Sequence, residues 1–153
     1  MPSVTGKLDD RRIIIDVGVQ PIAHAGQAAE RFATFPMQPI TPLRGLIDTG
    51  AQITCITKKA AKAAGLKPRG KRRIGNVSSV EMHDAYSFIL GAWYADNIND
   101  VMNQTRGYFT FEAVLGADFK DNDDFDVLIG MDIITQGTLT VAKQDEFSWV
   151  LGA

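Results

Sequence analysis

The sequence predicts a mainly β protein of one domain with one or two short helices. Short runs of β-branched and apolar residues recur along the chain and are separated by Gly, Pro, Asn and Asp, which is typical of strands joined by turns. Helical patterns are confined to two short segments. A chain of 153 residues is long enough to bury roughly 70% of its unfolded surface in one core, without disulfides or metal. We therefore treat residues 1–153 as a single domain.

The first strand is predicted over residues 12–20, which are rich in Ile and Val. Pro21 ends it, because proline cannot donate to the next ladder hydrogen bond. Residues 21–42 contain prolines and small residues and predict a long connecting loop. Loops of this length are uncommon in compact domains unless they are functional or mobile.

Residues 43–56 predict two strands that flank a turn at residues 48–50. Thr57 then stands at the N-cap of a short helix over residues 58–64, and Gly65 occupies the C′ position where a left-handed backbone ends many helices.

Apolar residues alternate with polar ones over residues 72–90 and predict a long hairpin whose tip lies at residues 75–79. Residues 91–107 are interpreted as an insertion. A further strand is predicted over residues 108–115.

The C-terminal part begins with a continuous apolar strand over residues 127–129. A short helix over residues 132–136, closed by Gly137, follows. The last predicted elements are two strands at residues 138–142 and 147–151.

Two motifs place polar groups directly after apolar runs. In the first, Leu46 and Ile47 lead into Asp48, Thr49 and Gly50. A carboxylate above an apolar floor is costly, so it persists where hydrogen bonds satisfy it or where it performs chemistry. The second motif, over residues 125–134, has an apolar pair, then Gly130, Met131 and Asp132. Its Leu128-Ile129-Gly130 repeats the pattern of Leu46-Ile47-Asp48, as a fold with internal twofold symmetry would.

These motifs, in this order, resemble the two signatures of the retropepsin-like aspartic peptidases, in particular the DNA-damage-inducible cellular branch and its bacterial relatives. The resemblance extends over about residues 11–151. It implies an acid-protease half-barrel that works as a homodimer, because each chain has one Asp-Thr-Gly. The implied activity is that of an aspartic endopeptidase on a peptide or protein substrate, with a water activated by Asp48 of both subunits.

The resemblance also assigns roles to individual residues. Asp48, Thr49 and Gly50 form the catalytic loop, in which Thr49 would bond to the opposite subunit's loop and Gly50 would leave room for substrate backbone. Ala51 lacks the hydroxyl that pepsin-type enzymes place beside the carboxylate, which implies a less acidic working range. Asp132 is expected to brace a turn and not to serve as a second catalytic acid. The residues expected to bind substrate are Ala51, Ile74, Asn76, Val77, Leu128 and Gly130, with Leu46 and Ile53 adding to the apolar pockets.

Two other functions stay open at this point. One is a catalytically silent module of the same fold that binds a peptide or partner by strand addition. The other is a purely structural dimerisation domain. The intact Asp-Thr-Gly weighs against a silent module, because peptide binding alone does not require a carboxylate at the axis.

The charges do not indicate nucleic acid or a membrane as a partner, because 16 Lys and Arg against 18 Asp and Glu give a net charge of −2. Residues 58–73 hold eight of the basic residues and could meet an acidic partner. A solvated helix face and hairpin base is the favoured interpretation, because no aromatic residues interleave the charges. Residues 118–126 are acidic but fail the calcium-loop pattern, so we expect an exposed loop.

The remaining chemically distinctive residues predict no cofactor and no metal. Cys55 is interpreted as a small core residue, and His24 and His83 as surface or packing residues. The sequence contains no zinc-binding helix, phosphate-binding loop or dinucleotide fingerprint. It has neither an apolar signal core near its start nor a run of roughly 18 apolar residues, so the expected location is the cytoplasm.

Overall fold

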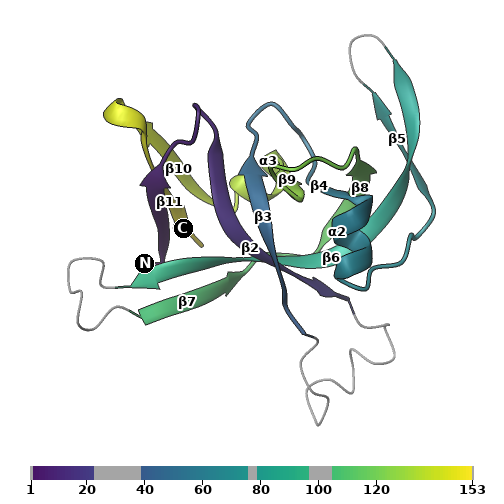
Figure 1. Ribbon diagram of the computed structural model, residues 1–153, viewed down its shortest axis with the longest axis horizontal. Coiled ribbons are helices and arrows are strands. Elements are labelled where there is room, and N and C mark those ends of the chain that lie inside the picture. Colours follow the sequence, from purple (N-terminus) through teal and green to yellow (C-terminus); the bar gives the residue numbers. More distant parts are fainter. Residues whose placement is uncertain (1, 23–38, 76–78, 97–104, 153) are drawn as a thin grey trace.

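The computed structural model describes residues 2–22, 39–75, 79–96 and 105–152 (Figure 1). The described part is mainly β, as predicted. Most of the predicted loop at residues 21–42 and most of the predicted hairpin tip lie outside the described residues. The strands are β1 Ser3–Lys7, β2 Ile13–Pro21, β3 Thr41–Ile47, β4 Cys55–Thr57, β5 Lys71–Gly75, β6 Val80–Asp96, β7 Thr105–Thr110, β8 Val114–Phe119, β9 Val127–Ile129, β10 Gly137–Ala142 and β11 Glu146–Leu151. The helices are α2 Lys58–Ala63 and α3 Met131–Ile134, with a 3-10 turn η2 at Lys143–Asp145.

The larger sheet has the strand order β2-β3-β9-β4-β8-β6-β5. Because β2 also pairs with β6, the sheet curls back on itself. The β5–β6 hairpin extends beyond this closed part, as Figure 1 shows at the upper right. A smaller sheet, β1-β11-β10, lies at the other end of the molecule.

The segment predicted as an insertion at residues 91–107 begins and ends within strands. β6 continues to Asp96, and β7 already begins at Thr105 and pairs with it. Aromatic residues hold this ladder together, since the rings of Trp93 and Tyr108 lie 4.8 Å apart between centroids. Gly91 leaves the space that the ring needs, because a Cβ there would lie 2.2 Å from Tyr108.

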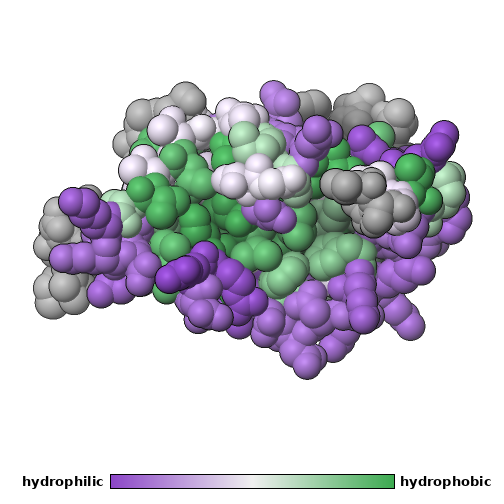
Figure 2. Space-filling model, turned by 90° about the horizontal axis from the view of Figure 1, so that it is seen from above, coloured by the Kyte–Doolittle hydropathy of each residue, from purple (hydrophilic) through white to green (hydrophobic). Residues whose placement is uncertain are grey.

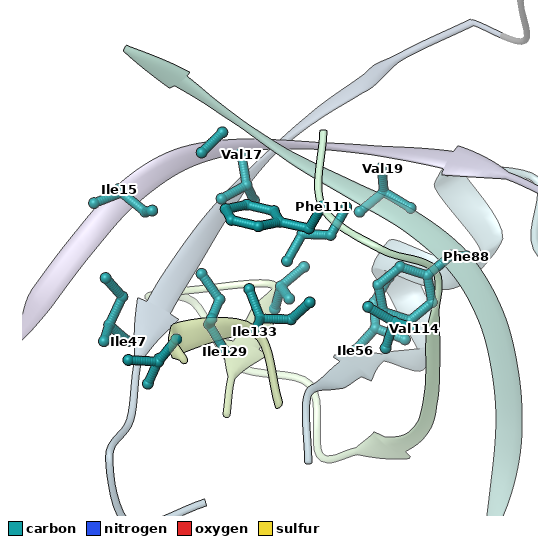
Figure 3. Close-up of a cluster of buried hydrophobic side chains, with 14 of the residues drawn as sticks. Ile15, Val17, Val19, Ile47, Ile56, Phe88, Phe111, Val114, Ile129 and Ile133 are labelled. Carbon is teal, nitrogen blue, oxygen red and sulfur yellow. The ribbon is translucent and has the colours of Figure 1, made fainter. Parts of the chain in front are cut away.

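The core lies between the curled sheet and α3 (Figure 3). Alternate residues of β2 point into it, and Val17 and Val19 are fully buried. Trp149 of β11 is also fully buried, stacks on Phe111 with centroids 5.2 Å apart, and donates its indole N–H to the Ile134 carbonyl. The smaller sheet and α3 thereby share one apolar core with the larger sheet.

The predicted ends of helix α2 are confirmed. The Thr57 side chain accepts a hydrogen bond from the Ala60 N–H at 3.1 Å, and Gly65 has φ of +74°. These two residues satisfy the helix start and turn the chain away at its end.

Strands β3 and β9 bring the two sequence motifs side by side. They run parallel, with Leu46 opposite Leu128 and Ile47 opposite Ile129. The repeat seen in the sequence is therefore a pair of neighbouring strands, and Asp48 and Gly130 follow them at equivalent positions.

Candidate active site

Asp48 stands on a tight turn directly after β3. Its N–H donates to the Ile129 carbonyl at 2.9 Å, and its carbonyl accepts from the Ala51 N–H at 3.2 Å. Its carboxylate oxygen Oδ1 accepts a hydrogen bond from the Gly50 N–H at 2.9 Å. These bonds fix the backbone and the half-buried carboxylate together.

Thr49 and Gly50 are both exposed. A Cβ on Gly50 would lie 3.2 Å from Asp48 Oδ1, so the close N–H to carboxylate contact favours glycine here. The exposed edge of this turn is where the sequence predicts contacts with substrate and with a second subunit.

Asp132 has a different environment, although it is the acid of the second motif. Its Oδ1 accepts the Thr54 hydroxyl at 2.7 Å and the Ile133 N–H at 3.0 Å, and its Oδ2 accepts the Thr54 N–H at 3.2 Å. Thr54 is fully buried, and its hydroxyl oxygen also accepts the Gly130 N–H at 3.0 Å. Asp132 is thus positioned as a brace between the two motifs, in the manner that the sequence resemblance implies.

Sequence reasoning did not identify Thr54 as the centre of this brace. The residue follows an apolar isoleucine in a run that reads as strand, and nothing in its spacing indicates a partner 78 positions away. Only strand pairing brings the two segments together, because β9 lies between β3 and β4 and pairs with both.

The structure corrects the prediction that Gly130 binds substrate. Gly130 is buried beneath the catalytic loop, and a Cβ there would lie 2.6 Å from the backbone of Ile53 and 3.0 Å from the Ala51 carbonyl. Its neighbour Met131 donates its N–H to the same Ala51 carbonyl at 2.8 Å. Glycine is needed here because two backbone segments approach each other.

A hollow of about 530 Å³ opens beside the catalytic loop, between that loop and β5. Three of the predicted substrate-binding residues, Ala51, Ile74 and Leu128, line it, whereas Asn76 and Val77 lie outside the described residues. The full described lining is Gly50, Ala51, Gln52, Ile53, Cys55, Arg72, Arg73, Ile74, Gly75 and Leu128.

Cys55 lies in the wall of this hollow and not in the core, which corrects the sequence interpretation. It is half-buried, and its Sγ donates to the Ile53 carbonyl at 3.8 Å. Burial raises the pKa of the thiol above its ordinary value. The thiol therefore stays protonated at neutral pH and contributes a small, weakly polar surface to the hollow.

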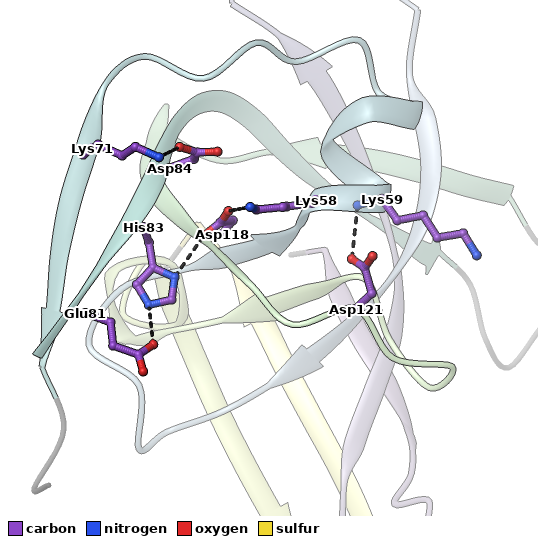
Figure 4. Close-up of polar contacts among 8 residues, drawn as sticks. All are labelled: Lys58, Lys59, Lys71, Glu81, His83, Asp84, Asp118 and Asp121. Atoms are coloured by element: carbon purple, nitrogen blue, oxygen red, sulfur yellow. Dashed lines mark hydrogen bonds and ion pairs between the residues drawn. The ribbon is translucent and has the colours of Figure 1, made fainter. Parts of the chain in front are cut away.

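Charged side chains tie the base of the β5–β6 hairpin to β8 and α2 (Figure 4). His83 Nδ1 lies 2.9 Å from Asp118 Oδ1, and Lys58 Nζ lies 3.4 Å from Asp118 Oδ2. Asp118 is 5% exposed, so its assignment to an exposed acidic loop is wrong. It belongs to β8, and the exposed acidic stretch begins after it.

His83 is a half-buried tie between strands, which is more specific than the surface or packing role predicted for it. His24 lies outside the described residues. A second tie at the hairpin base joins Lys71 to Asp84, and this pair lowers the pKa of Asp84 and raises that of Lys71. The base of the hairpin is therefore anchored, while Val80 and Met82 at the start of β6, toward the hairpin tip, are 57% and 59% exposed.

In the part of the chain that the structure describes, no group of three or more His, Cys, Asp or Glu side chains is arranged to hold a metal ion. No helix among these residues is long and apolar enough to cross a membrane.

Comparison with known proteins agrees with this geometry. The sequence pattern of a family described as aspartyl protease matches residues 39–133, which include the catalytic loop, the hairpin and the second motif. The crystal structure of a retropepsin-like aspartic protease from Rickettsia conorii is similar over 99% of this chain and 92% of that chain, with a TM-score of 0.58 and 13% sequence identity. No curated protein matches the chain.

A mainly β fold that pairs an Asp-Thr-Gly turn with a Gly-x-Asp motif defines the class of retropepsin-like aspartic peptidases. The chain belongs to the aspartyl protease family and has the retropepsin-like fold. The family resemblance and the fold class predicted from the sequence are both confirmed.

Proposed function

We propose that this protein is an aspartic endopeptidase that works as a homodimer, with Asp48 of each subunit forming the catalytic pair. The observation that carries the proposal is the contrast between the two motif acids. Asp48 stands on an exposed turn with its Oδ1 bonded to the Gly50 N–H. Asp132 is occupied by Thr54 and Ile133. One available motif acid per chain requires a second copy around a twofold axis to supply the other.

The proposed chemistry follows from placing two carboxylates close together. At about 3 Å they cannot both ionise, so the pair shares one proton. The ionised member takes a proton from a water as its oxygen attacks the scissile carbonyl carbon, and the protonated member donates to the carbonyl oxygen. Collapse of this intermediate breaks the C–N bond: one of its hydroxyl groups returns a proton to the ionised member as the carbonyl forms again, and the leaving amine takes a proton from the other member, so that the pair ends with one shared proton.

The described surface suits an extended peptide. Figure 2 shows the molecule from above the view of Figure 1. Hydrophobic residues gather in the middle of this face, and hydrophilic residues border them. The hollow beside the catalytic loop adds Ile53, Ile74 and Leu128 as apolar contacts. An extended peptide presents alternate side chains to such a surface.

The test is to measure peptide cleavage and oligomeric state of wild type and Asp48→Asn side by side. We expect Asp48→Asn to abolish cleavage while sedimentation still gives a dimer. Asp123→Asn is the matched control, because Asp123 is exposed and lies in the acidic loop after β8. The proposal would be overturned if the wild type sedimented as a monomer, or if Asp48→Asn still cleaved the peptide.

Mixing subunits tests the pair itself. After exchange, an equal mixture of wild type and Asp48→Asn should have about a quarter of the activity expected if all dimers were wild type, because only wild-type dimers hold two acids. Independent catalysis by each chain predicts half. A dimer that binds peptide without cleaving it would indicate the silent module instead.

A further inference from the structure

The hollow beside the catalytic loop has an unusual charge. Its described lining is neutral except for two cations, Arg72 and Arg73, both from β5. We propose that Arg72 makes the enzyme select a peptide with an acidic side chain, Asp or Glu, in this hollow. This inference rests on the proposed peptidase function and adds the class of substrate.

Arg72 is held in the wall of the hollow. It is half-buried, and its Nη1 donates to the Leu115 carbonyl at 2.5 Å across to β8. Side chains two residues apart on a strand share a face, so Ile74, which also lines the hollow, stands on the same side of β5. Arg73 is exposed. Arg72 is therefore the positioned cation, and Arg73 adds charge at the rim.

The charge of Arg72 is not neutralised by the described residues. No described carboxylate lies within 4 Å of Arg72 or Arg73, whereas Lys58 and Lys71 in the same basic segment are paired with Asp118 and Asp84. The acid across the hairpin, Glu81, instead contacts His83 Nε2 at 3.5 Å.

A guanidinium carries five N–H donors in a planar fork, and the bond to the Leu115 carbonyl uses one of its nitrogens. The remaining donors match the two oxygens of a carboxylate. Asp48 does not line the hollow. An acidic side chain that enters it meets Arg72, with Arg73 at the rim, and no described carboxylate lines the hollow.

The walls suit such a side chain in shape as well. The stem of Asp or Glu would lie against Ile53, Ile74 and Leu128, and the carboxylate would reach the arginine end. A volume of about 530 Å³ accommodates one side chain together with water. An amide of the same shape, Gln or Asn, would make the same apolar contacts without the charge.

The experiment uses peptides that differ only by Glu or Gln, with the substituted position moved stepwise along the peptide. For wild type we expect one position at which Glu raises kcat/KM on the order of tenfold over Gln, because a hydrogen bond to a charged group in a partly open site is worth that factor. Arg72→Gln should bring the ratio near one, and Arg72→Glu should reverse it. Arg72→Lys keeps the charge without the fork and should retain part of the preference.

Two further measurements separate this inference from the alternatives. Arg69→Gln removes an exposed cation of the same basic segment that does not line the hollow, and it should leave the ratio unchanged. Binding of the same peptides to Asp48→Asn, read by fluorescence anisotropy, tests the preference without cleavage. It also distinguishes failure of this inference from failure of the peptidase function.

Cleavage of both peptides with a ratio near one at every position would overturn the acidic preference and leave the peptidase function standing. A ratio that Arg72→Gln and Arg69→Gln lower equally would also overturn it, since a diffuse basic surface would then be responsible. Absence of cleavage together with Glu-selective, Arg72-dependent binding would support the acidic site and refute the peptidase function.

Discussion

Replacing Thr54 with valine removes one hydroxyl from the brace between the two motifs and keeps the side-chain shape. In the wild type this hydroxyl accepts the Gly130 N–H at 3.0 Å and donates to Asp132 Oδ1 at 2.7 Å. The valine leaves the N–H of buried Gly130 without a partner, which costs about 1–3 kcal/mol. The lost bond to the Asp132 carboxylate costs up to about 3 kcal/mol, but Asp132 is exposed and water replaces part of it.

We therefore expect Thr54→Val to lower the free energy of unfolding by about 2–4 kcal/mol, the sum of about 1–3 kcal/mol for the unpaired N–H and about 1 kcal/mol for the part of the carboxylate bond that water does not replace. For a chain of this size that corresponds to a fall in Tm of about 4–16 °C. Thr54→Ser keeps the hydroxyl and removes one methyl group, which costs about 1 kcal/mol.

Urea unfolding at neutral pH measures both variants against wild type, with unchanged m values confirming that the unfolding reaction is the same. Peptide cleavage below the transition should fall for Thr54→Val if the brace positions the catalytic loop. A Thr54→Val protein as stable as Thr54→Ser would refute the reasoning, because the hydroxyl would then contribute nothing beyond packing.

Three further predictions follow from single contacts. Gly130→Ala should destabilise the fold by about 1–3 kcal/mol, since its Cβ would lie 2.6 Å from the Ile53 backbone; an unchanged Tm would contradict this. Lys71→Met should lose most stability relative to wild type between pH 3.8 and 10.5, the ordinary pKa values of Asp84 and Lys71. Because the pair lowers the pKa of Asp84, the stabilisation is lost at the acid end only as pH falls below 3.8. Because the pair raises the pKa of Lys71, the stabilisation is lost at the alkaline end as pH rises above 10.5. Unfolding curves at a series of pH values check this, and a difference that does not change with pH would count against it. Tyr108→Phe should be neutral or stabilising by about 1 kcal/mol in thermal unfolding, because the hydroxyl is buried without a hydrogen-bond partner among the described residues and burial raises the pKa of Tyr108 to about 12. A clear loss of stability would show that the hydroxyl is bonded in solution.

The sequence predicted those parts of the fold that are specified locally. A run rich in Ile and Val located β2, a continuous apolar run located β9, and the capping residues Thr57 and Gly65 located the ends of α2. The turn that carries Asp48 was also predictable, because an acid and a glycine between two apolar runs is a local pattern. The resemblance of two such motifs in order added the fold class, which the structure confirms.

The sequence did not predict contacts that depend on pairing between distant strands. Asp118 reads as the first residue of an acidic loop, but the pairing of β8 with β4 and β6 buries it beside His83. Cys55 reads as core, but β4 has only three residues, and the hollow opens along one side of it. Arg72 reads as one of many surface cations, and only its bond to the Leu115 carbonyl distinguishes it.

In the proposed mechanism, the same pairing explains why the two motifs of one chain would not supply both acids. β3 and β9 are parallel and in register, so Asp48 and Gly130 occupy equivalent positions after them. At Asp48 the chain turns outward and the carboxylate has room. At Gly130 the backbone of Ile53 leaves no space for a side chain, because a Cβ would lie 2.6 Å from it. The contact that holds the catalytic loop in place therefore excludes an acid at the equivalent position of the second motif. A second chain with its own Asp48 supplies that acid without disturbing the brace, which is the physical argument for the proposed dimer.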